Sequence, residues 1–198
     1  MTTIAVIDHG AGNLVSIAQS LARVGADVIV ASEPSDIAKA DGLVLPGVGT
    51  TGGVMHGIDE AGFRPAITQW DRPLLGICVG LQVLFESSHE DDAKCFGFVP
   101  GSVERLRDAP RLPHIGWNDV SMNHDPLFAD IGPEATFYFV HSYAPRPSTS
   151  DTVIGTSTYG ETFVSAVRSG RRVGTQFHPE RSGNNGLQLL ANFVAMAA

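Results

Sequence analysis

The sequence predicts an α/β fold in which a mostly parallel central sheet is flanked by helices and carries an antiparallel β extension. In the first half, short and nearly all-apolar runs alternate with segments of helical spacing, which is typical of a parallel sheet covered on both faces. In the second half, from about residue 96 to residue 176, short strands are separated by turn residues. The chain has 198 residues, of which 43% are apolar, so we expect a single domain spanning residues 1–198.

The N-terminal apolar run predicts the first strand and the first helix. Residues 4–8 have the character of a strand that stops at a glycine-rich turn, and Asn13 suits the N-cap of the helix that follows. Gly25 suits the end of that helix. Apolar residues recur between them at helical spacing, namely Leu14, Ile17, Ala18 and Leu21.

Three further strands complete the predicted parallel half. They are expected at residues 27–31, 42–45 and 73–78, and a proline–glycine pair stops the second of them. A helix should follow the last strand. Its apolar face is predicted to consist of Leu81, Leu84 and Phe85.

A hairpin and a closing helix are predicted near the C-terminus. Residues 163–168 and 172–177 flank a short turn that contains Gly170. The last helix is expected to bury one apolar face, made of Leu187, Leu190, Ala191 and Val194.

Composition excludes several classes of function. The formal charge of −8 disfavours nucleic acids and anionic membranes as partners, and no segment has the features of a signal peptide or a membrane span. The two cysteines, Cys78 and Cys95, do not suggest a disulfide scaffold, so we expect a cytoplasmic, reducing environment. No histidine pattern has the spacing of metal ligands, and we expect neither a metal nor a cofactor.

The segment around Cys78 is the strongest candidate for chemistry. Gly76-Ile77-Cys78-Val79-Gly80 has the pattern G-x-C-x-G at a strand-to-helix junction, which is the thiol analogue of a nucleophile elbow. A helix N-terminus favours the thiolate, and the N–H of Val79 would face a developing oxyanion. The alternative is that Cys78 is a small buried residue between two accidental glycines. Cys95 has no elbow, so we interpret it as an ordinary packed or surface thiol.

His178 is the best candidate for the base that a cysteine nucleophile needs. It follows an apolar strand that Pro179 halts, and Glu180 lies two residues further on, where it could orient the imidazole. Alone, this H-P-E segment is better explained as a strand end carrying a solvated charge, and it is the combination with the elbow that favours a catalytic base. His9 is expected to be exposed, and His89 belongs to an acidic, solvated stretch that includes Glu90.

The motifs GICVGLQ (residues 76–82) and QFHPE (176–180) resemble those of the class I, or triad, glutamine amidotransferases. Further segments resemble one branch, the glutaminase subunits of imidazole glycerol phosphate synthase. They extend over nearly the whole chain in the order of the family, which makes the set specific. These segments are DHGAGNLVSI (8–17), PGVG (46–49), PHIGWN (113–118), FVHSYA (139–144) and QFHPERSG (176–183).

This resemblance implies a reaction and a role for each matching residue. Cys78 would attack the side-chain amide of glutamine, His178 would transfer the proton, and Glu180 would hold His178. A glutamyl thioester would form, ammonia would leave, and water would release glutamate. An oxyanion loop would contain Gly47 and Val48, and the substrate would be held by Gly49, Val79, Gln82, Ser142 and Tyr143.

The resemblance also implies a partner, because the ammonia of such enzymes does not enter solution. It would pass to a cyclase subunit with a (β/α)8 barrel, forming a heterodimer that makes imidazole glycerol phosphate and an aminoimidazole carboxamide ribonucleotide in histidine biosynthesis. Asn13, Trp117 and Arg181 match positions expected at that interface. A helix cap for Asn13 and a packed aromatic for Trp117 are the alternative interpretations.

The chain departs from the family pattern in two places. Arg181 stands where the family usually has lysine, which keeps the charge but changes its geometry. The PGVG segment is followed by residues 50–53 (TTGG) rather than by an early aromatic residue, so we expect a more flexible loop there.

Three other functions are compatible with parts of the sequence. The glutaminase that feeds pyridoxal phosphate synthesis is similar, but that family carries a Gly-Gly-Glu-Ser type of loop where this chain has PGVG. The PfpI-like group also has an elbow cysteine but tends to lack a late H-P-E segment. A non-catalytic regulatory protein on the same scaffold would not need Cys78, His178 and Glu180 together.

Overall fold

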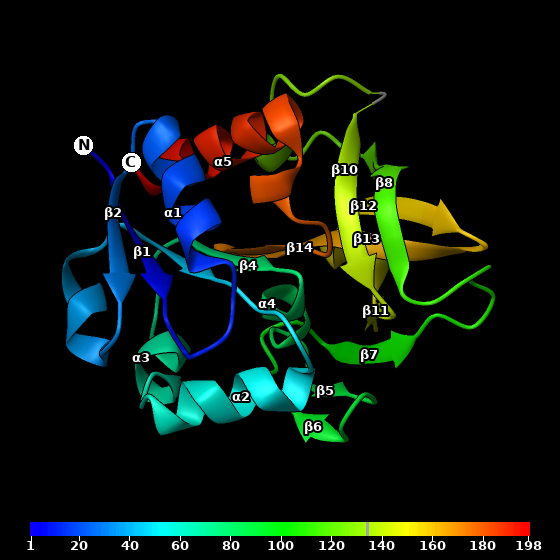
Figure 1. Cartoon of the computed structure of the whole chain (residues 1–198), viewed down its shortest axis with the longest axis horizontal. Coiled ribbons are helices and arrows are strands. Elements are labelled where there is room, and N and C mark those ends of the chain that lie inside the picture. Colours follow the sequence, from blue (N-terminus) through cyan, green and yellow to red (C-terminus); the bar gives the residue numbers. More distant parts are fainter. Residues whose placement is uncertain (134) are drawn as a thin grey trace.

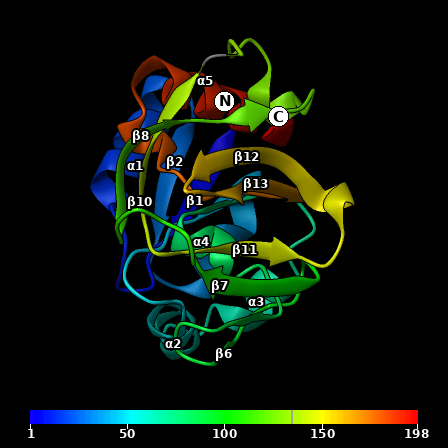
Figure 2. The ribbon, with the colours of Figure 1, turned by 90° about the vertical axis from the view of Figure 1, so that its right-hand side faces the viewer.

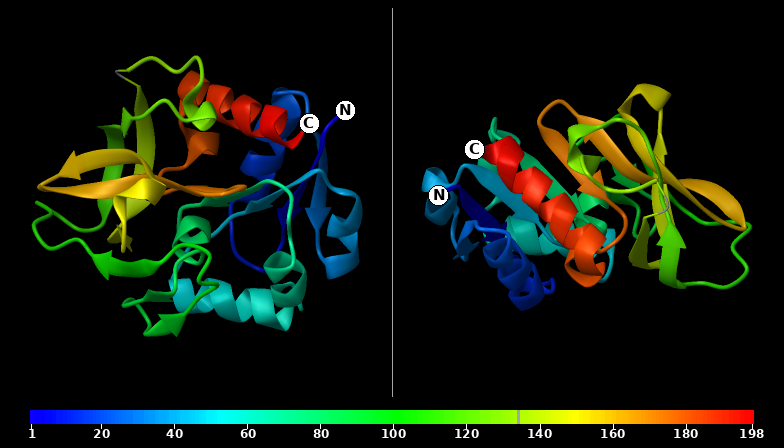
Figure 3. Two further views of the ribbon diagram at one scale, coloured as in Figure 1. Left: turned by 180° about the vertical axis from the view of Figure 1, so that it is seen from behind. Right: turned by 90° about the horizontal axis from the view of Figure 1, so that it is seen from above.

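The computed structural model describes residues 1–133 and 135–198 and has the predicted α/β architecture. A large sheet runs through the molecule with helices on both faces, and two smaller sheets lie at one end (Figure 1). Helices α1 and α5 cover one face, while α2 and α3 cover the other, as the opposite view also shows (Figure 3). Within the described residues, no helix is both long enough and apolar enough to cross a membrane.

The large sheet joins a parallel half to an antiparallel half. The pairs from β2 to β14 are parallel and those from β14 to β9 are antiparallel, so the predicted change of strand direction is confirmed. The strands are, in spatial order, β2 (Asp27–Ala31), β1 (Thr3–Ile7), β3 (Gly42–Leu45), β4 (Leu74–Ile77), β14 (Arg172–Thr175), β13 (Glu161–Ser169), β12 (Val153–Tyr159) and β9 (Ser121–Met122).

Two smaller sheets form the wall beside the carboxyl ends of the parallel strands. One is an antiparallel pair, and the other has four strands; Figure 2 looks onto this part of the molecule, with β12 and β13 above β11 and β7. The pair consists of β10 (Thr136–His141) and β8 (His114–Asp119). The four-stranded sheet consists of β11 (Tyr143–Pro147), β7 (Gly101–Arg105), β5 (Ser87–Ser88) and β6 (Ala93–Lys94).

The helices are mostly short, and the longest of them, α5, follows the last strand and has 15 residues. The α-helices are α1 (Leu14–Arg23), α2 (Thr51–Glu60), α3 (Arg64–Thr68), α4 (Val79–Gln82) and α5 (Gly183–Ala197). Short 3-10 helices occur at η1 (Pro34–Lys39), η2 (Pro126–Phe128), η3 (Ser150–Thr152) and η4 (Pro179–Arg181).

Three local predictions are corrected by the structure. Asn13 precedes α1, but its side chain makes no capping hydrogen bond; its backbone carbonyl instead accepts from the N–H of Ile17. The helix after Cys78 ends at Gln82, although Leu81, Leu84 and Phe85 are all buried as predicted. Helix α5 buries a face rotated from the predicted one, made of Gly186, Leu189, Leu190, Phe193 and Val194.

The expectation of a flexible segment at residues 50–53 is also wrong. Thr51 begins helix α2, and the side chain of Thr50 accepts a hydrogen bond from the N–H of Gly53 at 3.2 Å, which caps the helix. Two glycines in the first turn lower helix propensity, but a threonine cap and the burial of Val54 and Ile58 offset this cost.

Strands β3, β4 and β14 are neighbours in the sheet and run in the same direction. Their carboxyl ends therefore meet at one edge, which is where open α/β sheets place their ligand sites. The chain continues from these three ends into Gly47, Cys78 and His178. The topology thus brings together an oxyanion-loop candidate, a nucleophile candidate and a base candidate that lie far apart in the sequence.

Candidate active site

Cys78 lies in a sharp turn between β4 and α4, with φ 55° and ψ −109°. A non-glycine residue in this region costs about 1–3 kcal/mol and persists only where its surroundings impose it. The elbow predicted at Cys78 is therefore present, and its backbone is strained. The turn places the thiol at the N-terminus of α4, although Cys78 itself is 96% buried, since only 4% of its surface is exposed.

Glycines impose this turn by allowing backbones to touch. A Cβ atom at Gly76 would lie 2.4 Å from the carbonyl oxygen of Gly80, and one at Gly80 would lie 1.8 Å from that of Leu45. Gly47 is equally restricted, because its Cβ would lie 2.6 Å from the backbone nitrogen of Gly80. The end of β3, the elbow and the start of α4 are thus packed backbone against backbone, which a side chain at any of these positions would separate.

His178 follows β14 and is held by its own backbone and by Glu180. Its N–H donates to the carbonyl of Tyr138 at 2.9 Å, and its carbonyl accepts from the hydroxyl of Ser182 at 2.6 Å. The ring Nδ1 lies 2.9 Å from Oε1 of Glu180, whose side chain is fully buried. Because a carboxylate only accepts, Nδ1 carries the hydrogen and Nε2 is left to face the pocket.

The charge state of His178 is set by opposing influences. Burial lowers the pKa of His178, but hydrogen bonding and charge from Cys78 and Glu180 raise it to about 10. The imidazole is therefore a strong proton acceptor whenever the thiol supplies a proton. In its protonated form the Cys78 thiol donates to the carbonyl of Val140, with an S···O distance of 3.8 Å. Transfer of that proton to His178 would produce a thiolate–imidazolium pair.

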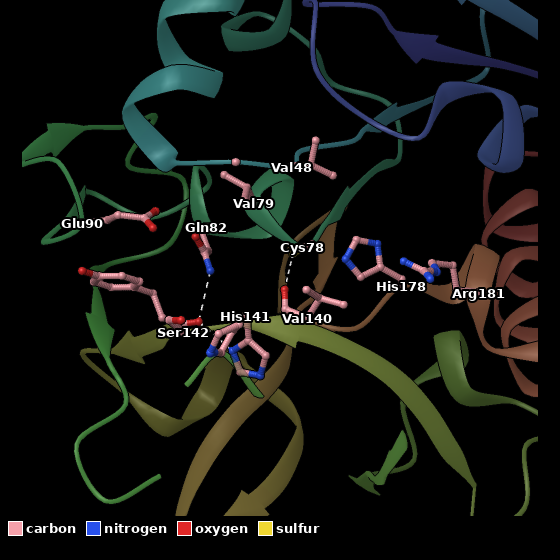
Figure 4. A pocket seen from close by; sticks show the side chains of 13 residues that line it. Val48, Cys78, Val79, Gln82, Glu90, Val140, His141, Ser142, His178 and Arg181 are labelled. Atoms are coloured by element: carbon pink, nitrogen blue, oxygen red, sulfur yellow. Dashed lines mark hydrogen bonds between the residues drawn. The ribbon is translucent and has the colours of Figure 1, made fainter. Parts of the chain in front are cut away.

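A pocket of about 290 Å³ opens in front of Cys78 and His178 (Figure 4). Every residue predicted to bind substrate lines it, and so does Val48 of the predicted oxyanion loop. Gly47 lies beneath the pocket, against Val79 and Gly80, rather than in its wall. The predicted substrate-binding residues that line the pocket are Gly49, Val79, Gln82, Ser142 and Tyr143.

The structure adds pocket residues that the sequence interpretation missed. Glu90 was assigned to a solvated acidic stretch, but its carboxylate lines the pocket and accepts from the backbone N–H of Thr51 at 3.1 Å. Burial raises the pKa of Glu90, and the hydrogen bond from Thr51 opposes this effect. The wall is completed by Pro113, Val140 and His141. These three belong to the motif segments 113–118 and 139–144, which were a usable signal, whereas the place of Glu90 depends on a turn that packs against Thr51 of α2.

The residues expected at a partner interface occupy different places. Arg181 lines the pocket at its mouth, and its guanidinium lies 4.4 Å from the ring centre of Tyr138 (Figure 4). Trp117 is 56% exposed on β8, with its ring 6.1 Å from that of Tyr138, so the packed-aromatic alternative does not describe it. Asn13 is half-buried at the start of α1 and outside the pocket.

Two residues outside the predicted site require comment. His9 is buried rather than exposed, and its Nε2 donates to the carbonyl of Pro46 at 2.7 Å, which anchors the base of the Gly47–Gly49 segment. Cys95 is half-buried, and burial raises the pKa of its thiol to about 11, which fits the prediction of an ordinary thiol.

Comparison with known proteins identifies the family. The chain matches the family described as glutamine amidotransferase class-I over residues 5–197. The chain belongs to this family. The parallel sheet, the elbow cysteine and the late histidine described above are therefore features of an amidotransferase chain, and the predicted fold class is confirmed.

Curated relatives cover nearly the whole amidotransferase chain. The imidazole glycerol phosphate synthase subunit HisH of Synechococcus sp. (strain JA-3-3Ab) is 45% identical over 98% of this chain and 94% of that protein. The subunit of the same name from Acinetobacter baylyi is 45% identical over 98% of both chains. The resemblance inferred from the motifs is thereby confirmed.

Solved structures support the fold alone, because their sequences are distant. A crystal structure of a glutamine amidotransferase has a TM-score of 0.76 at 18% identity and covers 98% of each chain. The structure of PurLQS from Thermotoga maritima has a TM-score of 0.72 at 16% identity, also covering 98% of each chain.

Proposed function

We propose that this protein is the glutaminase subunit of imidazole glycerol phosphate synthase in histidine biosynthesis. It hydrolyses glutamine to glutamate and ammonia, and the ammonia serves the synthase reaction. The observation that carries this conclusion is the convergence of Gly47, Cys78 and His178 at three neighbouring strand ends, in a chain 45% identical to named subunits of that enzyme.

The proposed reaction proceeds through a thioester on Cys78. His178 accepts the thiol proton, and the sulfur attacks the side-chain amide carbon of glutamine. The imidazolium then protonates the leaving nitrogen, the C–N bond breaks, and ammonia departs. Water, deprotonated by His178, attacks the thioester and releases glutamate. Glu180 keeps the hydrogen on Nδ1 of His178, so that Nε2 handles every proton.

The pocket walls provide the binding groups for this substrate. Glu90 presents a carboxylate to the α-ammonium group of glutamine, and the segment of Ser142 and Tyr143 with Gln82 lies beside it (Figure 4). The N–H groups of Val79 and Gly49 donate to no acceptor among the described residues, so they are available for the oxyanion. Loss of one oxyanion donor costs about 2.7–4 kcal/mol, which makes the position of the loop decisive for rate.

As a subunit, the protein works with a partner, which we propose to be a cyclase with a (β/α)8 barrel in a heterodimer. Exposed side chains around the mouth of the pocket support docking there, since Val48 is 42% exposed and Trp117 is 56% exposed. Arg181, stacked on Tyr138, adds a positive charge at the mouth. Ammonia leaving Cys78 would enter the partner at this point. The half-buried Asn13 is proposed to lie at the edge of the same interface.

The proposed products of the complex are imidazole glycerol phosphate and an aminoimidazole carboxamide ribonucleotide. We place the reaction in the cytoplasm, because a reducing environment keeps the thiol of Cys78 available. Both cysteines are free in this structure.

The test is glutamate release from three mixtures: the chain alone, the chain with a candidate cyclase, and both with a nucleotide ligand of the cyclase. We expect the isolated chain to be slow and the complete mixture to be severalfold faster or more, because Gly49, with φ 89° and open space around it, allows the loop to reorient. Equal turnover in all three would show that the loop is not a switch. No turnover in any mixture would reject the glutaminase assignment.

A diazo-ketone analogue of glutamine separates an enzyme from a non-catalytic scaffold. It should alkylate one thiol, and peptide mapping should find the label on Cys78. Label on Cys95 instead would contradict the proposed nucleophile.

A further inference from the structure

Two buried amides, those of Gln82 and Gln176, form a hydrogen-bond network that reaches the sulfur of Cys78. The Nε2 atom of Gln176 donates to Sγ of Cys78 at 3.6 Å. Gln176 is completely buried and follows the end of β14, two residues before His178. The mechanism described above does not use this side chain, although it touches the reacting atom.

The hydrogen-bond pattern fixes which end of Gln176 faces the sulfur. Gln82 must present its NH2 group to the carbonyl of Tyr143, at 3.2 Å, because a carbonyl only accepts. The same NH2 group lies 3.1 Å from Gln176, so the atom of Gln176 that faces it is the acceptor Oε1. The NH2 group of Gln176 is therefore left to face Cys78.

Further hydrogen bonds fix the orientation of the Gln82 amide. The hydroxyl of Thr51 donates to Oε1 of Gln82 at 3.2 Å, which agrees with the same orientation of the Gln82 amide. The carbonyl of Tyr143, which accepts from Gln82, also accepts from Nδ1 of His141 at 2.8 Å. Nε2 of His141 then accepts from Nδ1 of His114 at 3.0 Å. Turning the Gln82 amide would set its oxygen against the oxygens of Tyr143 and Gln176, and turning the Gln176 amide would set its NH2 group against that of Gln82. Each buried polar group left unsatisfied costs about 1–3 kcal/mol.

We propose that Gln176 is a further catalytic residue, whose amide N–H stabilises the thiolate of Cys78 and is held in that orientation by Gln82. A negatively charged sulfur accepts an N–H bond more strongly than a neutral thiol does, so the contact favours ionisation. This inference rests on the proposed function only in taking Cys78 as the nucleophile.

The contact serves both halves of the reaction. Before acylation it raises the fraction of Cys78 that is present as thiolate. In hydrolysis of the thioester, the C–S bond breaks and its electron pair returns to Sγ, where the N–H of Gln176 again stabilises the charge. His178 stays the only group that transfers protons, because an amide neither gains nor loses one in this pH range.

The experiment is alkylation of Cys78 by iodoacetamide as a function of pH, without glutamine. Gln176→Met removes the amide and keeps an unbranched side chain of similar length. We expect the midpoint of the rate–pH curve to move upward by about one pH unit, since one hydrogen bond to a charged group changes an equilibrium by about tenfold or more. The kcat/KM for glutamine near neutral pH, measured with the cyclase partner, should fall by a similar factor.

A second variant covers the case in which Gln176→Met does not fold. Gln176→Glu keeps an acceptor for Gln82 but presents a carboxylate oxygen to the sulfur, so the midpoint should move upward further. Gln188→Met is the matched control, because it removes a half-buried amide on α5 that, among residues 1–133 and 135–198, bonds only to Asn192. It should leave the curve unchanged.

A purely structural role would lower the melting temperature of the Gln176 variants without moving the alkylation midpoint, and that result would overturn the inference. An unchanged midpoint in a folded Gln176→Glu protein would do the same. The proposed function fails separately, if the wild-type protein with its partner releases no glutamate or if iodoacetamide does not label Cys78.

Discussion

The parallel and antiparallel halves of this molecule contribute to the pocket in different ways. Strands β3 and β4 are buried along their whole length, and their residues act only where the strands end. Strands β8 and β10 alternate between buried and more exposed positions. They contribute side chains to the pocket wall through Pro113, which precedes β8, and through Val140 and His141 at the end of β10. The parallel half supplies the proposed nucleophile, base and oxyanion loop, and the antiparallel half supplies the wall.

This difference implies different sensitivities to mutation. At the ends of the parallel strands, function depends on backbone contacts that leave no room for a single carbon atom. In the antiparallel half, function depends on side-chain hydrogen bonds such as that between His114 and His141. Steric clashes should therefore dominate the effects of mutation in the parallel half. Changes of protonation state should dominate them in the antiparallel half.

The largest expected effect is that of removing the nucleophile of the parallel half. Cys78→Ala should lower glutamine hydrolysis by at least about a thousandfold, because no other group in the pocket can form the thioester. Synthesis from ammonium salt at high pH should survive, since the cyclase site is proposed to lie on the partner. Assays of both activities in the complex test this. Loss of the ammonia-dependent activity as well would mean that Cys78 supports assembly instead.

The second effect compares glycines of the two halves. Gly80→Ala should lower the free energy of unfolding by about 3 kcal/mol, because its Cβ would lie 1.8 Å from the carbonyl oxygen of Leu45. Gly155→Ala on β12 should cost about 1 kcal/mol, since its nearest neighbour, the Cβ of Ala166, lies 3.2 Å away. Gly132→Ala, with open space, is the control. Urea unfolding measures the free energy of unfolding of all three variants. Equal losses of stability in Gly80→Ala and Gly155→Ala would contradict the proposed difference between the two halves.

The third effect concerns the base and its orienting carboxylate. Glu180→Gln should lower kcat/KM by about a hundredfold, less than loss of the nucleophile. The pKa of His178 is raised to about 10, so His178 keeps its proton until the pH nears that value, and activity should fall as pH rises through it. Removing the Glu180 charge lowers the pKa of His178. The fall of activity on the alkaline side of the pH profile, its alkaline limb, should therefore move to lower pH.

The matched control for Glu180 is the exposed pair His56–Glu60, whose nitrogen and oxygen lie 3.3 Å apart with about 70% of each side chain exposed. Glu60→Gln should change neither rate nor pH profile, because exposed pairs are screened by solvent. An unmoved alkaline limb in Glu180→Gln would show that Glu180 does not set the charge of His178.

The smallest effect tests protonation in the antiparallel half. Burial lowers the pKa of His141 to about 3, so the folded protein keeps it neutral while the unfolded chain binds a proton below about pH 6.5. The stability linked to His141 is thus fully present above pH 6.5 and is lost as pH falls toward 3. The slope is about 1.4 kcal/mol per pH unit for one proton.

His141→Asn should therefore make the acid loss of stability shallower, as measured by urea unfolding between pH 5 and pH 7.5. His124→Asn, which removes an exposed histidine from the same half, should leave the slope unchanged. Identical slopes for wild type and His141→Asn would show that His141 is not the group that titrates.

The sequence allowed most of the parallel half and the chemistry at its strand ends to be predicted. Continuous apolar runs mark buried strands, and G-x-C-x-G marks a turn whose steric requirement is local. The hairpin around Gly170 was equally predictable, since Ser169 pairs with Arg172 across it. Predictions failed where surroundings overrode local preference, as at residues 50–53, which became the capped start of α2.

What the sequence determined by itself was thus the local part: strands, the elbow at Cys78, and the pairing of His178 with Glu180 two residues away. Only the tertiary structure decided which distant side chains meet them. The contact of Gln176 with Cys78 spans 98 residues, and it exists because β14 pairs with β4 in one register. The place of Glu90 in the pocket likewise depends on packing of its turn against α2. No local propensity encodes such contacts, because they arise from strand pairing and burial between segments that are remote in the chain.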